Sequence, residues 1–261
     1  MSGLLPFELI YKMIPKTIHY CWFGRNPLPK SAVKCINSWR KFFPDYEIKE
    51  WNEDNFDVNM IPYTADAYAA KKYAFVSDYA RFWVLYHYGG VYFDTDVEVI
   101  SSMDDIICRG AFMGIEVPAG VNMRHPMVAP GLGVAVEAGH EIYKRALEHY
   151  EKTSFVVKDG VILHESIVPL TTRLLIEYGM EPNDDMQEVS GIWIYPKDFF
   201  NPYDDLTGVL SKTKNTRSIH WYSATWQNGN RYRKWLSRVF HRIFGTNLNG
   251  VWNLRNKLKS K

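Results

Sequence analysis

Two acidic residues interrupt a hydrophobic run near the middle of the chain. Asp94 and Asp96 lie within residues 91–100, which read VYFDTDVEVI and are mainly β-branched or aromatic. Such a run predicts a strand, and residues two apart on a strand point to the same face. Neighbouring carboxylates repel each other and are costly to bury unless a cation accompanies them. The spacing therefore predicts a site for Mg²⁺ or Mn²⁺, which bind carboxylates and substrate phosphates. The alternative is a pair of solvated acids at a strand end.

An acidic and a basic residue precede this run on a predicted helix. Asp78 and Arg81 are three positions apart, so they share one face of a helix over residues 75–88. Gly89 and Gly90 are expected to end this helix, because the chain often leaves a helix through a glycine in the left-handed backbone conformation. The pair could face a ligand held by the metal, since a guanidinium contacts a phosphate or hydroxyl groups through two hydrogen bonds. The alternative is a surface ion pair, which contributes little to stability.

The first fifty residues predict the opening of an α/β sheet. Residues 17–22 form an apolar run that Gly24 and two prolines close, which indicates a buried strand. Residues 28–43 carry apolar side chains at helical spacing, and residues 46–51 alternate as a second strand. A strand, a helix and a strand joined by short connections are typical of an α/β fold.

The rest of the chain predicts further helices and strands without a dividing linker. Further helices are expected at 65–72 and 137–150, and short strands at 192–195 and 218–222. Residues 1–230 are therefore interpreted as one catalytic domain, followed by a C-terminal segment over 231–261.

Composition limits the class of protein. Of 261 residues, 46% are hydrophobic and 23% are charged, which is the balance of a globular protein and excludes disorder over most of the chain. No apolar stretch approaches the roughly 20 residues of a membrane span. The N-terminus lacks the basic and small-residue regions of a signal peptide. The three cysteines form no CxxC pair, which argues against a disulfide framework or zinc site. These features predict a cytoplasmic protein.

Charge is distributed unevenly along the chain. Nine of the 31 basic residues and none of the 29 acidic residues lie in 231–261. Within this tail, apolar residues such as Trp235 and Phe240 follow helical spacing with arginines between them, which predicts a basic amphipathic helix. We expect it to associate peripherally with an anionic membrane at the inner face of the plasma membrane, and not with nucleic acid. The alternative is that the apolar stripe packs on the catalytic domain.

Four segments resemble one known family. Residues 74–100, which include SDYAR and GGVYFDTD, closely resemble the DxD sugar-binding region of glycosyltransferase family 32. Residues 14–57 are similar to the N-terminal strand, helix and strand of that family, and residues 191–202 and 216–226 to its C-terminal blocks. The combination of SDxxR with GGxYxDxD is far more specific than a DxD alone.

The resemblance implies a fold and a reaction. The implied fold is of GT-A type, an α/β Rossmann-like nucleotide-sugar-binding domain with a mixed central sheet. The implied reaction is retaining transfer of a sugar from a nucleotide-sugar donor, with a uridine-linked hexose expected, in the presence of Mn²⁺ or Mg²⁺. The expected acceptor is a growing surface polysaccharide or a polyprenyl-linked oligosaccharide, as in bacterial capsular polysaccharide synthesis.

The resemblance also implies roles for particular residues. Asp96 matches the main metal ligand, and Asp94 matches a residue that contacts the metal or the donor. Asp78 and Arg81 resemble the pair that holds the donor sugar. His220 would be a further ligand of the metal or the diphosphate. The remaining implied donor contacts are Ser223 and Trp226 at the diphosphate, and His19, Tyr20, Trp22 and Phe23 at the nucleotide base and ribose.

Two other functions are consistent with parts of the sequence. The run FDTDVEV also resembles the nucleophile strand of haloacid-dehalogenase-type phosphatases, in which Asp94 would attack phosphorus. That motif normally opens the chain and needs a later lysine and acidic pair. A non-catalytic sugar-binding module would also account for 17 Tyr, 14 Phe and 9 Trp. It would not require DxD, SDxxR and His220 together.

Overall fold

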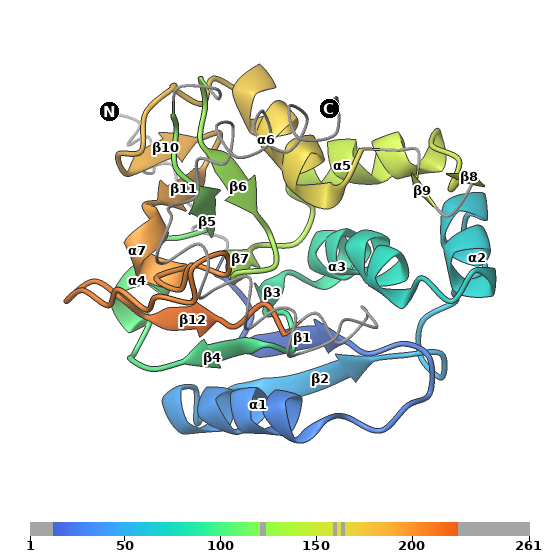
Figure 1. Ribbon diagram of the computed structural model, residues 1–261, viewed down its shortest axis with the longest axis horizontal. Coiled ribbons are helices and arrows are strands. Elements are labelled where there is room, and N and C mark those ends of the chain that lie inside the picture. Colours follow the sequence, from blue (N-terminus) through green and yellow to red (C-terminus); the bar gives the residue numbers. More distant parts are fainter. Residues whose placement is uncertain (1–12, 121–123, 159–160, 163–164, 224–261) are drawn as a thin grey trace, which may run out of the picture.

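The structure is a computed structural model that describes residues 13–120, 124–158, 161–162 and 165–223. Its centre is a mixed sheet with the strand order β10-β11-β5-β7-β3-β1-β2, in which β6 pairs with β5 (Figure 1). The strands of this sheet are β1 (Thr17–Cys21), β2 (Glu47–Trp51), β3 (Gly90–Tyr92), β5 (Phe112–Val117), β6 (Met127–Ala129), β7 (Val134–Val136), β10 (Gln187–Val189) and β11 (Ile192–Tyr195).

The sheet contains both parallel and antiparallel pairs of strands. Strand β1 pairs in parallel with both β2 and β3, whereas β7 runs antiparallel to β3 and to β5. Strand β11 is again parallel to β5. The mixed α/β sheet expected from the sequence is therefore confirmed, although the central strands β5, β6 and β7 were not predicted.

Helices cover both faces of the sheet (Figure 1). They are α1 (Lys30–Phe42), α2 (Pro62–Ala69), α3 (Tyr73–Tyr88), α4 (Asp104–Ile107), α5 (Glu141–Glu151), α6 (Ile167–Glu177) and α7 (Lys197–Phe200). Helix α1 buries Ala32, Cys35, Ile36 and Trp39 at the predicted helical spacing. The predicted helix at 65–72 lies three residues earlier, because Pro62 is accepted at a helix start. The helix expected from 137 begins only at Glu141, where the preceding His140 caps it by accepting from the Ile142 amide.

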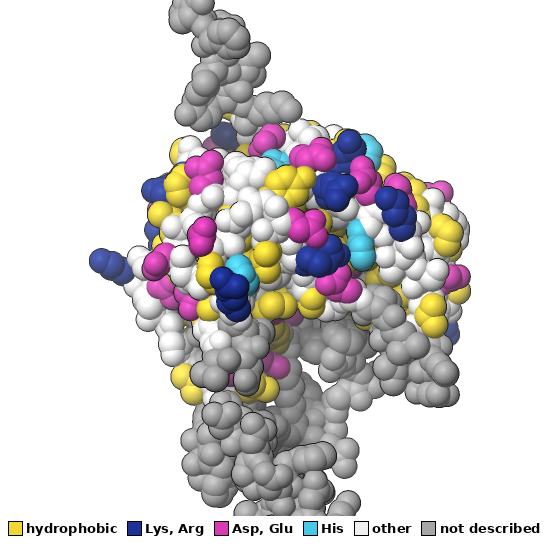
Figure 2. Space-filling model, turned by 90° about the horizontal axis from the view of Figure 1, so that it is seen from above, with side chains coloured by type: hydrophobic (Ala, Val, Ile, Leu, Met, Phe, Trp, Pro, Cys, Tyr) yellow, Lys and Arg dark blue, Asp and Glu magenta, His cyan; other side chains and the backbone are white. Residues whose placement is uncertain are grey.

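Successive side chains of β1 point to opposite faces of the sheet and so belong to two separate clusters of the core. Ile18 and Tyr20 face the cluster that contains Trp39 of α1, whereas Cys21 belongs to the cluster under α3, α5 and α6. On the outer side of α5 and α6, basic and acidic side chains are interspersed (Figure 2), and several pair with one another, such as Arg173 with Glu177. No helix within the described ranges is both long and apolar enough to cross a membrane.

The strand predicted over 91–100 is interrupted at its acidic residues. Strand β3 ends at Tyr92, and β4 (Val97–Val99) leaves the main sheet and pairs antiparallel with β12 (Ser218–His220). Between them the Val97 amide donates to the Asp94 carbonyl at 3.0 Å, which closes a turn. The expectation that Asp94 and Asp96 share one face of a strand is therefore wrong.

The described residues contain one further pair of strands outside the main sheet, β8 (Val157–Lys158) with β9 (Val161–Ile162).

Packing explains why the chain turns at this point. Trp39 of α1 donates its indole N–H to the Val97 carbonyl at 2.8 Å, and Ser38 Oγ accepts from the Val99 amide at 2.9 Å. Helix α1 thus binds β4 directly and holds it away from the main sheet. The strand predicted at 218–222 ends at His220, two residues early, because Tyr222 has a positive φ of 48°.

Candidate active site

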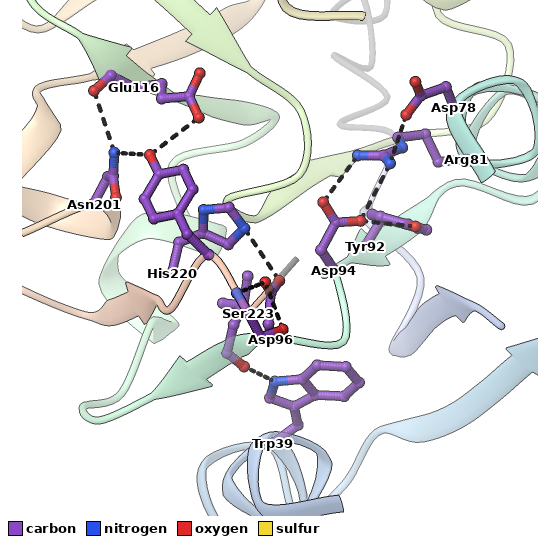
Figure 3. A network of polar contacts seen from close by, with 12 residues as sticks. Trp39, Asp78, Arg81, Tyr92, Asp94, Asp96, Glu116, Asn201, His220 and Ser223 are labelled. Atoms are coloured by element: carbon purple, nitrogen blue, oxygen red, sulfur yellow. Dashed lines mark hydrogen bonds and ion pairs between the residues drawn. The ribbon is translucent and has the colours of Figure 1, made fainter. Parts of the chain in front are cut away.

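The acidic turn lies at the carboxyl end of β3, beside the carboxyl end of the parallel strand β1. Three parts of the chain meet there: helix α3, residues 93–96, and residues 220–223 after β12 (Figure 3). The carboxyl edge of an α/β sheet is where such folds bind ligands, because loops and helix ends converge on it.

Arg81 is the centre of a buried ion-pair cluster. Its Nη2 lies 2.9 Å from Asp78 Oδ1 and 3.2 Å from Asp94 Oδ1, and its Nη1 lies 3.3 Å from Asp94 Oδ2. Arg81 and Asp78 are 5% and 8% exposed, so this is not the surface ion pair considered as an alternative. Burial opposes the charge of Arg81, but Asp94 and the other groups around it, Asp78 among them, together outweigh that effect and raise its pKa. Burial also raises the pKa of Asp78 to about 7, although Arg81 counteracts the rise.

Tyr92 of the GGxYxDxD motif and Gly131, to which the sequence analysis gave no role, hold Asp94 against Arg81. The guanidinium carbon of Arg81 lies 5.0 Å from the centre of the Tyr92 ring, and the Tyr92 hydroxyl donates to Asp94 Oδ1 at 3.2 Å. On another side, a Cβ at Gly131 would lie 2.0 Å from Asp94 Oδ2 and 3.0 Å from Arg81 Nη1. A residue with a side chain would therefore displace Asp94, and only glycine fits at position 131. Its place in the Pro130–Gly131 turn between β6 and β7 is the signal that could have indicated it.

Asp96 belongs to a different set of contacts. Its Oδ1 lies 3.1 Å from His220 Nε2, and its Oδ2 accepts from the Ser223 amide at 2.8 Å and the Ser223 hydroxyl at 3.1 Å. Burial opposes the charge of Asp96, but the contacts with His220 and Ser223 outweigh it and lower its pKa well below the usual range. The same pairing raises the pKa of His220 in spite of its burial.

The residues present fit a divalent cation. Asp94, Asp96 and His220 each offer one ligand atom, and these atoms lie within 4.8 Å of one another. Two hard carboxylate oxygens and one imidazole nitrogen form a donor set that suits Mn²⁺ or Mg²⁺. In this structure His220 Nε2 lies 3.1 Å from Asp96 Oδ1, and a cation bound between these groups would supply positive charge beside the carboxylate.

Two of the predicted donor contacts, His19 and Tyr20, lie on β1 and are buried. His19 is buried, accepts from the Trp51 indole N–H at 3.1 Å through Nδ1, and donates from Nε2 to the Gly89 carbonyl at 3.0 Å. Burial lowers its pKa to about 4, so the ring is neutral and joins β1 to the end of α3. Tyr20 is also buried and donates to Glu50 at 2.6 Å, with its ring edge against Trp39.

Trp22 is placed where a ligand could reach it. It is partly exposed and lines a cleft at the carboxyl ends of β1 and β2, together with Arg25, Asn26, Pro27, Glu50, Asn52, Glu53 and Asp54. Phe23, in contrast, is buried against Phe56. Trp226 lies outside the described residues, as does the predicted C-terminal tail.

A second unpredicted group adjoins His220. Glu116 at the end of β5, Asn201 after α7, and Tyr222 form mutual hydrogen bonds beside the imidazole. No local pattern in the sequence indicates this group, because its members are far apart in the chain and each is of an ordinary residue type.

Known proteins resemble this chain in sequence. The family model of the glycosyltransferase sugar-binding region containing DXD motif matches residues 29–113. Inositol phosphoceramide mannosyltransferase 1 of Schizosaccharomyces pombe is 26% identical over 203 residues, which cover 68% of this chain and 61% of that protein. Mannosyl phosphorylinositol ceramide synthase CSH1 of Saccharomyces cerevisiae is 26% identical over 161 residues, covering 58% and 39%. The chain thus spans less than two thirds of these relatives.

Among solved structures, a glycosyltransferase involved in the glycosylation of the major capsid of PBCV-1 is 12% identical, with a TM-score of 0.47 over 84% of this chain and 96% of that one. The order of the mixed sheet, with the DXD turn at the carboxyl end of β3, agrees with the GT-A type that the sequence resemblance implies. The match over residues 29–113 includes α3 and the acidic turn, so this part of the chain is similar to the glycosyltransferase sugar-binding region containing DXD motif.

Proposed function

We propose that this protein is a metal-dependent glycosyltransferase that moves a sugar from a nucleotide-sugar donor to a glycan or lipid acceptor. One observation carries the proposal. A three-residue candidate cation site formed by Asp94, Asp96 and His220 lies directly beside a buried Asp78–Arg81 pair, and the two share Asp94. A cation site next to buried groups that can bind hydroxyls suits a substrate with a diphosphate at one end and a sugar at the other.

Each part of the site would have a separate task. Asp94, Asp96 and His220 would hold the cation, which when bound neutralises charge that develops on the leaving diphosphate. Arg81 and Asp78 would fix the hydroxyl groups of the donor sugar, since their buried, mutually paired geometry is rigid. The partly exposed Trp22 offers an indole face in the cleft where the nucleotide base would stack. We further propose retention of configuration at the transferred sugar, which the anomeric form of the product would test.

Two candidate pairs of donor and acceptor are proposed. A uridine-linked hexose is the donor expected from the sequence resemblance, with a surface polysaccharide or a polyprenyl-linked oligosaccharide as the acceptor. The names of the two yeast relatives favour a second candidate, a mannose donor and a lipid acceptor, because both names describe mannosyl transfer to an inositol-containing ceramide.

A panel of nucleotide sugars separates these candidates. Uridine-linked glucose, galactose and N-acetylglucosamine and guanosine-linked mannose would each be incubated with the protein and Mn²⁺, and the released nucleoside diphosphate measured. We expect slow, Mn²⁺-dependent hydrolysis of one donor, abolished by a chelator. Failure of every donor to be hydrolysed or to raise the melting temperature would contradict the proposal. Hydrolysis of phosphomonoesters with a phosphorylated Asp94 would instead establish the phosphatase alternative.

The basic C-terminal tail suggests where the enzyme works. We propose that residues 231–261 hold it at an anionic membrane surface, where a lipid-linked acceptor would lie. Each basic residue near such a surface contributes on the order of 1 kcal/mol, which salt screens. The protein should sediment with anionic vesicles, less so in roughly 0.5 M salt, and a chain ending at residue 230 should remain in the supernatant while still hydrolysing the donor. Intact protein that ignores these vesicles at low salt would refute the tail's role.

A further inference from the structure

The chain reaches Asp96 through a short and unusual segment. Strand β12 ends at His220, and three residues later the Ser223 amide and hydroxyl both donate to Asp96 Oδ2. The Trp221 amide donates to the Asp96 backbone carbonyl at 3.0 Å. Residues 220–223 therefore contact Asp96 through its main chain and its side chain.

The backbone of this segment is held in a conformation that costs free energy. Tyr222 has a φ of 48°, in the left-handed region that a bulky residue rarely adopts. This turn brings the Ser223 amide onto Asp96. An unfavourable backbone conformation persists only where other contacts stabilise it, so the contacts of Tyr222 must account for this turn.

The Tyr222 side chain is anchored at its far end by two residues. Its hydroxyl donates to Glu116 Oε1 at 3.0 Å and accepts from Asn201 Nδ2 at 2.7 Å. Asn201 is 1% exposed, and its Nδ2 also donates to the Glu116 backbone carbonyl at 3.2 Å. Figure 3 shows Glu116 and Asn201 on the opposite side of His220 from Asp78 and Arg81.

The anchored ring also packs against the candidate metal ligand. The Tyr222 ring centre lies 4.1 Å from the centre of the His220 imidazole, with the planes tilted by 60°. The imidazole is thus held between the Tyr222 ring on one side and Asp96 at its Nε2. Fixing the phenol hydroxyl therefore restricts the position of the imidazole as well as the turn that delivers Ser223.

We propose that Glu116, Asn201 and Tyr222 are positioning residues that together act as a latch for residues 220–223. The latch holds His220 and Ser223 against Asp96 and so completes the site from the side opposite Arg81. It acts through His220 and Ser223 and does not itself touch the donor. The consequence of the latch for cation binding rests on the proposed function. The placement of residues 220–223 by the latch is a property of the protein alone.

The substitution Tyr222→Phe tests the latch with the smallest change, because it removes the hydroxyl and leaves the ring. Amide hydrogen exchange of the full-length protein without added metal would be followed in peptides covering residues 218–223. We expect exchange there to become about tenfold faster, since two hydrogen bonds that hold the strained turn in place are lost. The matched control is Tyr195→Phe, a buried tyrosine among Phe112, Phe199 and Phe200 that lies outside the latch. Unchanged exchange in Tyr222→Phe would overturn the latch.

Binding of Mn²⁺ alone, measured by calorimetry, tests the consequence for the cation site. The dissociation constant of Tyr222→Phe should rise about tenfold, while turnover at saturating Mn²⁺ stays within about threefold of the unmodified protein. A role in general stability would instead lower turnover through loss of folded protein, which a thermal melt detects. Faster exchange with unchanged Mn²⁺ affinity would overturn the positioning of His220.

Two variants of Glu116 make the test specific. Glu116→Gln keeps an oxygen that can accept from Tyr222, so it should behave nearly as the unmodified protein, whereas Glu116→Ala should reproduce Tyr222→Phe. Combining Glu116→Ala with Tyr222→Phe should add little to either, because both remove the same hydrogen bond. Additive losses would contradict a shared latch. If the unmodified protein binds no Mn²⁺, the metal-dependent function fails, and the exchange experiment still decides the latch by itself.

Discussion

Replacing Asp96 by Asn is expected to abolish sugar transfer, with a loss of about a thousandfold in turnover and no remaining dependence of donor binding on Mn²⁺. The carboxylate uses Oδ1 for His220 and Oδ2 for two donors of Ser223. An amide removes the charge that would hold the cation. It also turns one of these acceptors into a donor, which would then face either the two donors of Ser223 or Nε2 of His220. The measurement is turnover across a Mn²⁺ titration, with a thermal melt to confirm folding.

Asp45→Asn is a matched control for this substitution. Asp45 is exposed in the turn between α1 and β2, away from the acidic turn, so the same loss of charge there should leave turnover and Mn²⁺ dependence unchanged. Turnover of Asp96→Asn close to that of the unmodified protein would refute the assignment of Asp96 as a metal ligand.

Replacing Arg81 by Lys should lower kcat/KM for the donor by about a hundredfold even though the charge is kept. The guanidinium contacts Asp78 through Nη2 and Asp94 through both terminal nitrogens while it lies over the Tyr92 ring. A single ammonium cannot occupy all of these positions, so Asp94 loses the contacts that fix it beside Asp96. Steady-state kinetics with the donor identified by the panel would measure the loss.

Arg145→Lys provides the comparison for Arg81→Lys. Arg145 lies on the exposed side of α5, where its Nη1 is 3.4 Å from Glu148, and surface pairs of this kind contribute little. We expect this variant to keep full activity. If Arg81→Lys also stays within a few-fold of the unmodified protein, Arg81 is a structural residue and does not hold the donor sugar.

Local spacing in the sequence determined much of the site. The three-residue separation of Asp78 and Arg81 placed them on one turn of helix, and the structure pairs them at 2.9 Å. The apolar periodicity of residues 28–43 predicted α1 and its buried face. Two carboxylates in a hydrophobic run indicated a cation site whatever their backbone conformation, because the repulsion between buried charges depends on proximity.

The tertiary structure decided how these parts are joined. Asp94 and Asp96 were expected on one face of a strand, but β4 is drawn away by Trp39 and β12, so Asp94 turns to Arg81 and Asp96 to His220. Gly131 is required because the β6–β7 turn packs on Asp94 from a distant part of the chain.

The latch shows the limit of sequence reasoning most clearly. Tyr222 reaches Glu116 across 106 positions and Asn201 across 21, and each is of a type that is common in any chain. Periodicity tells which residues share a face of one helix or strand, but not which faces later meet. That depends on the order of strands in the sheet, which places the ends of β3, β5 and β12 around one site only once the whole core has packed.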